Sequence, residues 1–323
     1  MKHQLATLPP DTSGEHDARS LSDSEVSALT VTPRRHYGRW AIGILLLAVT
    51  AALLRSLLNN ENIDKAVIVD YLFSSEILQG LENTLIITVL AMSIAMVLGT
   101  VVAAMRTSSN PLARWLAWAF AFAFRSTPVL VQLFFWFNLA LIFPEITLGI
   151  PGTNFNLGQW DTNVIMTPLV AAVIGLGLSE SAYYSEVVRS GLISVDPGQR
   201  EAAQAIGMSG LQTFRKIVLP QTIRVILPPT GNQLIAMLKY SSLASVIGFT
   251  DLAGTAAQIY SVNLKNVELL IVISFWYFVA TSILSIGQYV LERRYGKGYG
   301  SSVQAPSFGS RLWSNLKFRS SHS

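Results

Sequence analysis

Six apolar stretches, each near the length that crosses a lipid bilayer, restrict what this chain can fold into. A helix needs about 20 mostly apolar residues to span the hydrocarbon core of a membrane. Only 13% of the 323 residues are charged, whereas a soluble domain carries about 25%. The predicted spans run over residues 40–54, 80–105, 127–143, 164–189, 222–247 and 268–291. We therefore expect an all-α membrane protein with about six transmembrane helices.

The segments around these spans divide the chain further. Residues 1–35 are polar and aperiodic, which is typical of a disordered tail, and they lack the apolar core and cleavage site of a secretory signal. Residues 36–79 are expected to form an extra N-terminal transmembrane helix and an outer loop. Residues 80–295 would form the transmembrane domain, with a cytoplasmic loop at 190–220, and residues 296–323 a basic cytoplasmic tail.

The third predicted span is the least regular of the six. The apolar stretch 115–143 is too long for one upright helix, and Arg125 and Pro128 interrupt it. We expect an interfacial piece first and then a span over about 127–143. Residues 144–163 contain no Lys or Arg and are rich in turn formers, as an outer loop should be.

The positions of the basic residues orient the spans. Cytoplasmic loops of membrane proteins carry an excess of Lys and Arg, and most of the 23 Lys and Arg residues fall on one side of the predicted spans. Arg55, Lys65 and Lys265 fall on the other side, and Lys239 lies within the fifth span. This asymmetry predicts that both termini are cytoplasmic. It also makes residues 248–267 a second outer stretch, with room for an amphipathic helix.

The longest polar interruption in the second half of the chain, residues 196–220, predicts two helices joined by a tight turn. Asp196 suits the N-cap of the first helix, and Pro197 suits its first position. Gln199 stands where a capping box requires it. The helix should end just before Gly207, which suits the left-handed residue that follows a helix.

A second capping signal opens the other helix of this hairpin. Ser209 and Gln212 have the spacing of a capping box, and we expect Pro220 to close the helix. The segment is tethered to the membrane at both ends and is not strongly basic, which argues against a DNA-binding helix-turn-helix. A rigid hairpin held at the cytoplasmic surface suits contact with a partner, and an ordinary amphipathic hairpin is the alternative interpretation.

The residue inventory argues against chemistry on this chain. There are no cysteines, hence no disulfide, thiolate metal site or cysteine nucleophile. The four histidines, His3, His16, His36 and His322, lie in or beside the tails. The sequence also lacks the G-x-x-x-x-G-K-[ST] loop that cradles phosphates. We therefore expect no enzyme activity and no bound cofactor, and any ATP that drives the protein must bind a separate subunit.

The hairpin carries a family resemblance. Glu201-Ala202-Ala203, Gly207 and Ile217-x-Leu219-Pro220 resemble the EAA signature of ATP-binding-cassette importer permeases. Over about residues 80–295, further motifs resemble the polar amino acid permeases of the histidine/glutamine type. These motifs are Gly80-Leu81-x-x-Thr84-Leu85, Arg125-Ser126-Thr127-Pro128, Ala182-Tyr183-x-x-Glu186-x-x-Arg189, Gly198-Gln199, Leu219-Pro220-Gln221 and Lys239-x-Ser241-Ser242-Leu243. Ser126 stands where Gly is usual and Tyr240-Ser241 where Asp-Thr is usual, which leaves the substrate open but not the class.

The resemblance implies a type I importer (MetI-like) permease fold in the inner (plasma) membrane. It implies partnership with ATP-binding-cassette ATPase subunits and with a second permease, either a copy of this chain or a different one. An external solute-binding protein would deliver a small polar solute, a polar amino acid or close analogue, and no nucleic acid is expected. The implied ATPase-coupling residues are Glu201, Ala202, Ala203, Gly207, Leu211 and Phe214.

Polar residues within the spans are candidates for the substrate pathway. Glu180 and Lys239 are intramembrane charges, which by default suggest a functional site, and Ser241 and Ser242 follow Lys239 closely. Glu180 would pair either with Lys239 or with a cationic group of the solute. Lys239 would meet a substrate carboxylate or the negative end of a broken helix, or else extend to the outer interface.

Other residues are expected to have structural roles. Glu186 and Arg189 are three apart on one helix face, which predicts a local ion pair. Positioning of the hairpin is the alternative for this pair. Pro128 and Pro220 are expected to shape the backbone at the third span and at the end of the hairpin.

Two other classes of function remain open from the sequence alone. A stand-alone channel or secondary transporter would need an internal repeat or a membrane-embedded charge relay. Only Glu180 and Lys239 are candidates for such a relay, and no clear repeat is visible. A membrane anchor or sensor would use the hairpin to dock a cytoplasmic partner without transporting a solute.

Overall fold

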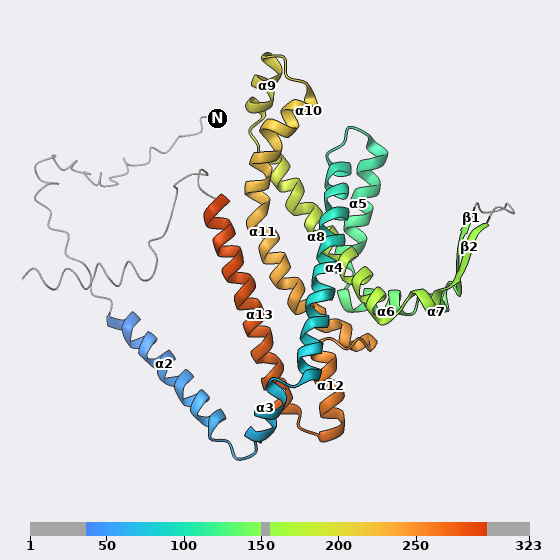
Figure 1. The fold of residues 1–323 in the computed structure, drawn as a ribbon. Helices are drawn as coiled ribbons and strands as arrows, with labels where there is room; N and C mark the ends of the chain where they lie inside the picture. The colour runs from blue at the N-terminus through green and yellow to red at the C-terminus, as the bar shows by residue number, and fades with distance from the viewer. Residues whose placement is uncertain (1–36, 150–155, 296–323) are drawn as a thin grey trace, which may run out of the picture. The chain divides into compact units, whose positions relative to one another are not determined.

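The computed structural model describes residues 37–149 and 156–295, so the predicted tails lie outside the described residues. Figure 1 shows that the described part is predominantly helical. By its internal contacts the chain forms two compact units, one ending at Asn62 and the other beginning at Ile63. The predicted domain boundaries after residues 35, 79 and 295 stay predictions.

The first unit contains one described helix, α2 (Tyr37–Leu58). It has 22 residues and extends beyond the predicted span 40–54 at both ends. Arg55 lies in its last turn, where the negative end of the helix favours a cation.

The second unit contains the other described elements. In chain order they are α3 (Lys65–Leu72), α4 (Ser75–Arg106), α5 (Pro111–Ser126), α6 (Val129–Phe137), the 3₁₀ helix η1 (Leu139–Leu141), β1 (Glu145–Gly149), β2 (Asn156–Asp161), α7 (Thr162–Ile165), α8 (Pro168–Ile193), α9 (Pro197–Ala205), α10 (Gly210–Thr213), the π-helix η2 (Phe214–Val218), α11 (Leu219–Tyr240), the 3₁₀ helix η3 (Ser241–Ile247), α12 (Leu252–Asn263) and α13 (Asn266–Tyr295).

Helices α4 and α8 are the most closely associated pair in this unit. Small residues allow their backbones to approach. A Cβ placed on Gly99 would lie 2.8 Å from the carbonyl oxygen of Ser181, and one on Gly177 would lie 3.2 Å from that of Ala91. Such contacts are typical of membrane helices, because lipid is as apolar as the side chains and tight packing must hold the helices together.

The predicted third span is wrong in its placement. Residues 111–126 form the regular helix α5, which packs on α4 and α8, and α6 follows after a bend of 101°. The break lies at Thr127 and Pro128: Thr127 is extended, with φ −100° and ψ 130°. Proline forces this, because its ring disfavours the helical conformation in the residue before it. The sequence did contain the start of α5, since Asn110 caps that helix and Pro111 occupies its first turn.

The predicted outer loop 144–163 contains a β-hairpin that sequence reasoning missed. Strands β1 and β2 pair antiparallel, with Glu145 opposite Asp161 and Ile146 opposite Trp160. The side-chain amide of Gln159 donates a hydrogen bond to the Glu145 carboxylate. Figure 1 shows this hairpin projecting from the helices of the second unit, beyond α7.

The helix of the predicted fifth span, α11, continues directly from the second helix of the polar helical hairpin at residues 196–220. Pro228 and Pro229 lie inside α11 without ending it, and Gln288 of α13 donates a hydrogen bond to the carbonyl oxygen of Pro228 at 3.2 Å. The predicted span 222–247 is regular only as far as Tyr240, because residues 241–247 tighten into η3. Gly248, with φ +82°, ends that 3₁₀ helix.

The predicted outer stretch 248–267 contains the helix α12, as expected. Asp251 caps it by accepting a hydrogen bond from the Gly254 amide at 2.9 Å. The amide of Leu252, the residue after Asp251, donates a hydrogen bond to the hydroxyl of Thr84 in α4, also at 2.9 Å. Sequence reasoning missed α3, which α13 holds through a 2.7 Å hydrogen bond from Trp276 Nε1 to the Leu72 carbonyl oxygen.

Among the described helices, α4 and α13 are long and apolar enough to cross a membrane by length and composition alone, and the bent pair α5 and α6 would count as a third span. Helices α8 and α11 have 26 and 22 residues. Each carries a polar residue well inside the helix, Glu180 in α8 and Gln233 in α11. Polar side chains within a span usually face the protein interior or a cavity.

Candidate functional site

The first helix of the polar hairpin is capped at both ends. Asp196 Oδ1 accepts a hydrogen bond from the Gly198 amide at 2.7 Å. At the other end Gly207 has φ +81°, and the amides of Gly207 and Met208 donate to the carbonyl oxygens of Gln204 and Ala203 at 2.9 and 3.0 Å. This pair of bonds is a Schellman motif, and it confirms the predicted turn at Gly207.

One detail of the first cap was wrong. Within the described residues, the side chain of Gln199 makes no hydrogen bond back to Asp196, so the predicted capping box is absent. Asp196 instead caps the nearer amide of Gly198, as a short carboxylate can.

The second helix begins with the predicted capping box. The Gln212 amide donates to Ser209 Oγ at 3.3 Å, and the Ser209 amide donates to Gln212 Oε1 at 2.9 Å. Pro220 does not close this helix, however, because α10, η2 and α11 follow one another without a break. Proline lacks an amide proton and crowds the preceding turn. The π-helical stretch 214–218 widens that turn, with the Leu219 amide donating to the carbonyl oxygen of Phe214.

The hairpin therefore extends α11 and ends in a short, capped turn (Figure 1). Its exposed face is partly apolar: Ile206 is 77% exposed, Leu211 67% and Phe214 41%. Glu201 and Ala202 are exposed, whereas Ala203 is buried within the hairpin. An apolar patch at the end of a rigid projection can bind a partner without changing its own shape.

The predicted ion pair of Glu186 and Arg189 forms, with Arg189 Nη2 donating to Glu186 Oε1 at 2.6 Å. Sequence reasoning missed its third member, Arg106 at the end of α4, which also donates to the Glu186 carboxylate. Leu192 lies one turn after Arg189 on α8, and its carbonyl oxygen accepts a 2.8 Å hydrogen bond from Arg200 of α9. These contacts connect the ends of α4 and α8 and the start of the hairpin.

The candidate pathway residues do not gather as a single cluster. Glu180 is 8% exposed and lines a cavity of about 240 Å³ between α6, α8 and α11. Lys239 is exposed, and no Glu180–Lys239 ion pair forms among the described residues. The hydroxyl groups of Ser241 and Ser242 donate to the carbonyl oxygens of Leu238 and Lys239 within their own segment.

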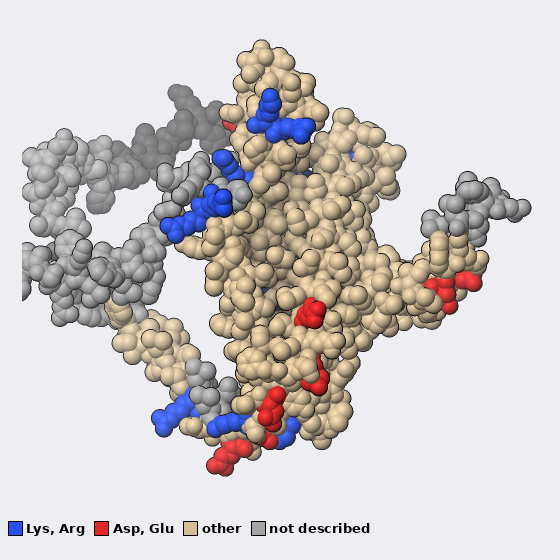
Figure 2. Space-filling model, in the orientation of Figure 1, with Lys and Arg blue, Asp and Glu red and all other residues tan. Residues whose placement is uncertain are grey.

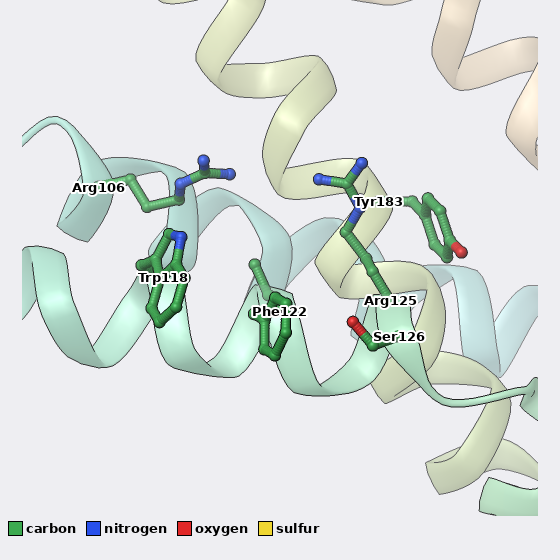
Figure 3. Close-up of a pocket in the computed structure, with 7 residues that line it drawn as sticks. Arg106, Trp118, Phe122, Arg125, Ser126 and Tyr183 are labelled. Carbon is green, nitrogen blue, oxygen red and sulfur yellow. The ribbon is translucent and has the colours of Figure 1, made fainter.

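A second cavity, of about 350 Å³, lies between α4, α5 and α8 and was missed from the sequence. Figure 3 shows Arg106 and Arg125 at opposite ends of the ring pair Trp118 and Phe122, with Tyr183 beyond Arg125. The two rings stack with centroids 5.3 Å apart. The sequence signal that could have indicated this cavity was Arg125, an arginine within an apolar stretch.

The described residues contain no group of three or more His, Cys, Asp or Glu side chains placed to hold a metal ion. The candidate functional site consists of the projecting hairpin at residues 196–220 and the two cavities beside α8. It suits the binding of a partner and of a polar solute.

Comparison with known proteins agrees with the sequence motifs. The sequence model of a family described as "binding-protein-dependent transport system inner membrane component" matches residues 95–297. The arginine transport system permease protein ArgU of Corynebacterium glutamicum is 39% identical over 285 residues, which are 88% of each chain. The glutamate/aspartate import permease protein GltK of Escherichia coli is 36% identical over 219 residues, 68% of this chain and 92% of that protein.

Solved structures show the same fold. A crystal structure of an amino acid ABC transporter with histidines has a TM-score of 0.61 and 36% identity, covering 72% of this chain and 99% of that one. The MetNI methionine ABC transporter, at 18% identity, has a TM-score of 0.54 over 68% of this chain and 95% of that chain. These similarities confirm the predicted MetI-like permease fold.

Proposed function

The chain belongs to the family of inner membrane components of binding-protein-dependent transport systems, and from this premise we propose that it imports polar amino acids or close analogues as the translocation subunit of an ATP-driven transporter. The observation that carries the proposal is the similarity to an arginine transport permease over 88% of both chains. The relatives favour this function over a stand-alone channel or secondary transporter. ATP would be hydrolysed by a separate subunit.

The hairpin is the proposed contact with that ATPase subunit. Its capped ends make it rigid, and its continuity with α11 allows a push at the hairpin to tilt a membrane span. Exposed Leu211 and Phe214 would enter an apolar cleft of the ATPase, and Glu201 would anchor the contact by charge-assisted hydrogen bonds. Gly207 supplies the turn, while Ala202 permits close approach and Ala203 packs the inside of the hairpin.

The proposed orientation places the hairpin and both termini in the cytoplasm. Figure 2 shows Lys and Arg side chains on the end of the second unit that carries α9 and α10, and both basic and acidic side chains near the opposite end. The proposed orientation rests on the excess of Lys and Arg on the α9–α10 side of the predicted spans, which the positive-inside rule places in the cytoplasm. Because the chain has no cysteine, single cysteines test this orientation. Leu211→Cys should react with an impermeant thiol reagent only from the cytoplasmic side, and Val164→Cys only from outside.

The proposed pathway runs beside α8, where Glu180 faces a cavity. Lys239, Ser241 and Ser242 are proposed to flank it at the outer end of α11. A second permease, identical or different, would complete the pathway. An external solute-binding protein would deliver the solute.

Co-purification tests the proposed coupling. The detergent-solubilised wild-type chain should bring down a cassette ATPase, and Glu201→Lys should lose it, because a lysine would stand where the acceptor is needed. Gln199→Lys is the matched control, since residue 199 lies on another face of the same helix and should leave the ATPase bound. Retention of the ATPase by Glu201→Lys, or its absence from the wild type, would overturn the proposal.

A further inference from the structure

The carboxylate of Glu186 in α8 accepts hydrogen bonds from two arginines that belong to different helices. Arg189, one turn later on α8, places its Nη2 and Nε atoms 2.6 and 3.2 Å from Glu186 Oε1. Arg106, the last residue of α4, donates to Glu186 Oε2. The side chains of Arg106 and Glu186 are 18% and 34% exposed, so salt and water screen this ion group only in part.

The second arginine is not needed to neutralise Glu186. Arg189 already places one positive charge against the carboxylate, and a pair three residues apart on one helix needs no other helix to form. Adding Arg106 leaves the group with one excess positive charge, and a partly exposed ion pair adds little stability. What Arg106 adds is a directional bond between α4 and α8.

Beyond this ion group, the last turn of α8 is bonded to both arms of the polar hairpin. The carbonyl oxygen of Leu192 accepts a 2.8 Å hydrogen bond from Arg200 Nη2 in α9, the first arm. The carbonyl oxygen of Gly191 accepts a 3.3 Å hydrogen bond from the hydroxyl of Thr222, in the first turn of α11, which continues the second arm. A displacement of the hairpin is therefore passed directly to α8.

The bond between Arg106 and Glu186 fixes how far along α8 the helix α4 sits. Elsewhere the contact of these helices consists of small and apolar residues such as Gly99 and Gly177, and no other hydrogen bond or ion pair joins α4 to α8 in the described part of the chain. Apolar contact is non-directional, and packed helices slide past one another by about 1–2 Å in conformational changes. A hydrogen bond reaches only about 3.2 Å, so a slide of that size would break it.

We propose that Glu186 is a positioning residue that makes α4 follow α8 when the ATPase subunit displaces the hairpin. It acts through Arg106, whose bond keeps the two helices in register so that they move as one body. Without this bond α8 slides on α4, and part of each ATP-driven displacement is lost before it reaches the solute pathway. This inference rests on the proposed function, because it needs a hairpin that an ATPase displaces.

The ratio of solute imported to ATP hydrolysed measures this transmission. The full chain is reconstituted into liposomes with its co-purified ATPase and permease partners and the solute-binding protein, and uptake of radiolabelled L-arginine and release of phosphate are followed together. Arg106→Gln and Glu186→Gln should each lower the ratio by about fivefold or more, the lower end of coupling effects between two sites. A loss of folded complex would lower uptake and hydrolysis together and leave the ratio unchanged, so a merely stabilising ion pair gives a different result.

Arg189→Gln is the matched control. It removes the other arginine from the same carboxylate but leaves the bond between Arg106 and Glu186 in place, so it should keep the wild-type ratio. Equal losses in Arg106→Gln and Arg189→Gln would assign the ion group to charge compensation and overturn the positioning role. Unchanged ratios in Arg106→Gln and Glu186→Gln would overturn it as well.

A covalent bridge can replace the ion pair, because the chain has no cysteine. Arg106→Cys combined with Glu186→Cys removes both charges and should lower the ratio as Glu186→Gln does. Joining the two thiols with a bifunctional methanethiosulfonate of matching length should restore the ratio, and reduction should lower it again. The two single-cysteine variants, treated with the same reagent, are the controls. A bridged protein that stays as poorly coupled as the reduced one would overturn the proposal, since register would then not be what the ion pair supplies.

The same assay separates this inference from the proposed function. ATP-driven uptake by the wild type, with wild-type ratios in the variants of Glu186 and Arg106, would overturn the positioning role alone. No ATP-driven uptake by the wild type would overturn the proposed function itself.

Discussion

Gly207 provides a sharp test of the coupling hairpin. Its φ of +81° lies in the left-handed region, where a Cβ costs about 1–2 kcal/mol. A Cβ at this position would have no heavy atom within 4 Å, so a substitution is penalised by backbone strain and not by a clash. Asn tolerates this conformation best and a β-branched residue worst. The free energy of opening the turn should therefore fall in the order Gly, Asn, Ala, Val.

Hydrogen exchange measures this effect directly. A loss of about 1 kcal/mol in local stability raises the population of the open hairpin about fivefold, and the exchange rate of the amides in residues 196–213 should rise by the same factor for Gly207→Ala. Gly207→Val should go further and should also uncouple ATP hydrolysis from uptake while leaving membrane insertion intact.

Gly210 is the matched control for this series. It lies in the same hairpin, also has no heavy atom within 4 Å of a built Cβ, and does not have positive φ. Gly210→Ala should leave exchange unchanged or slow it, because Ala favours the helix. Equal exchange in the Ala variants at 207 and 210, or normal uptake by Gly207→Val, would refute the argument from backbone strain.

Three further predictions concern the rest of the second unit. A Cβ on Gly191 would lie 2.3 Å from a methyl carbon of α11, so Gly191→Ala should lower stability in thermal unfolding by about 1–3 kcal/mol, whereas Gly287→Ala, with open space around it, should not. Leu264 is 80% exposed and has φ +59°, so Leu264→Gly should raise stability by about 0.5–1 kcal/mol, and a decrease would contradict the strain. The hydrogen bond and charge of Lys265 hold the pKa of Asp64 below its usual 3.8. The stability that the Asp64–Lys265 ion pair adds is therefore fully present above pH 3.8 and is lost as the pH falls through the lowered pKa of Asp64. Hydrogen exchange in α3 should show this acid loosening, and Asp64→Asn, which keeps the cap but not the ion pair, should abolish it.

Local sequence signals predicted the hairpin well. Ser209, Gln212 and Gly207 act through bonds to residues close in sequence, so their effect can be read without knowing the fold. The same locality explains the Glu186–Arg189 pair, which spans a single turn of α8.

Contacts between distant segments could not be read in this way. Arg106 joins Glu186 only because α4 and α8 pack together. The cavities beside Tyr183 likewise depend on the 101° bend between α5 and α6. Pro128 signalled a break, but not which side of it would carry the longer helix. The prediction that Pro220 ends the second helix of the hairpin was wrong because the π-helical turn before it lets the helix continue.

ATP-driven uptake tests the central claim most directly. The full chain is reconstituted into liposomes with its co-purified ATPase and permease partners and with the solute-binding protein outside, and uptake of radiolabelled L-arginine is followed with Mg-ATP inside. The account predicts uptake that requires hydrolysable ATP and is lost in Glu201→Lys but kept in Gln199→Lys. Equal uptake with ATP, with a nonhydrolysable analogue and with no nucleotide would contradict it and would identify a channel or secondary transporter instead.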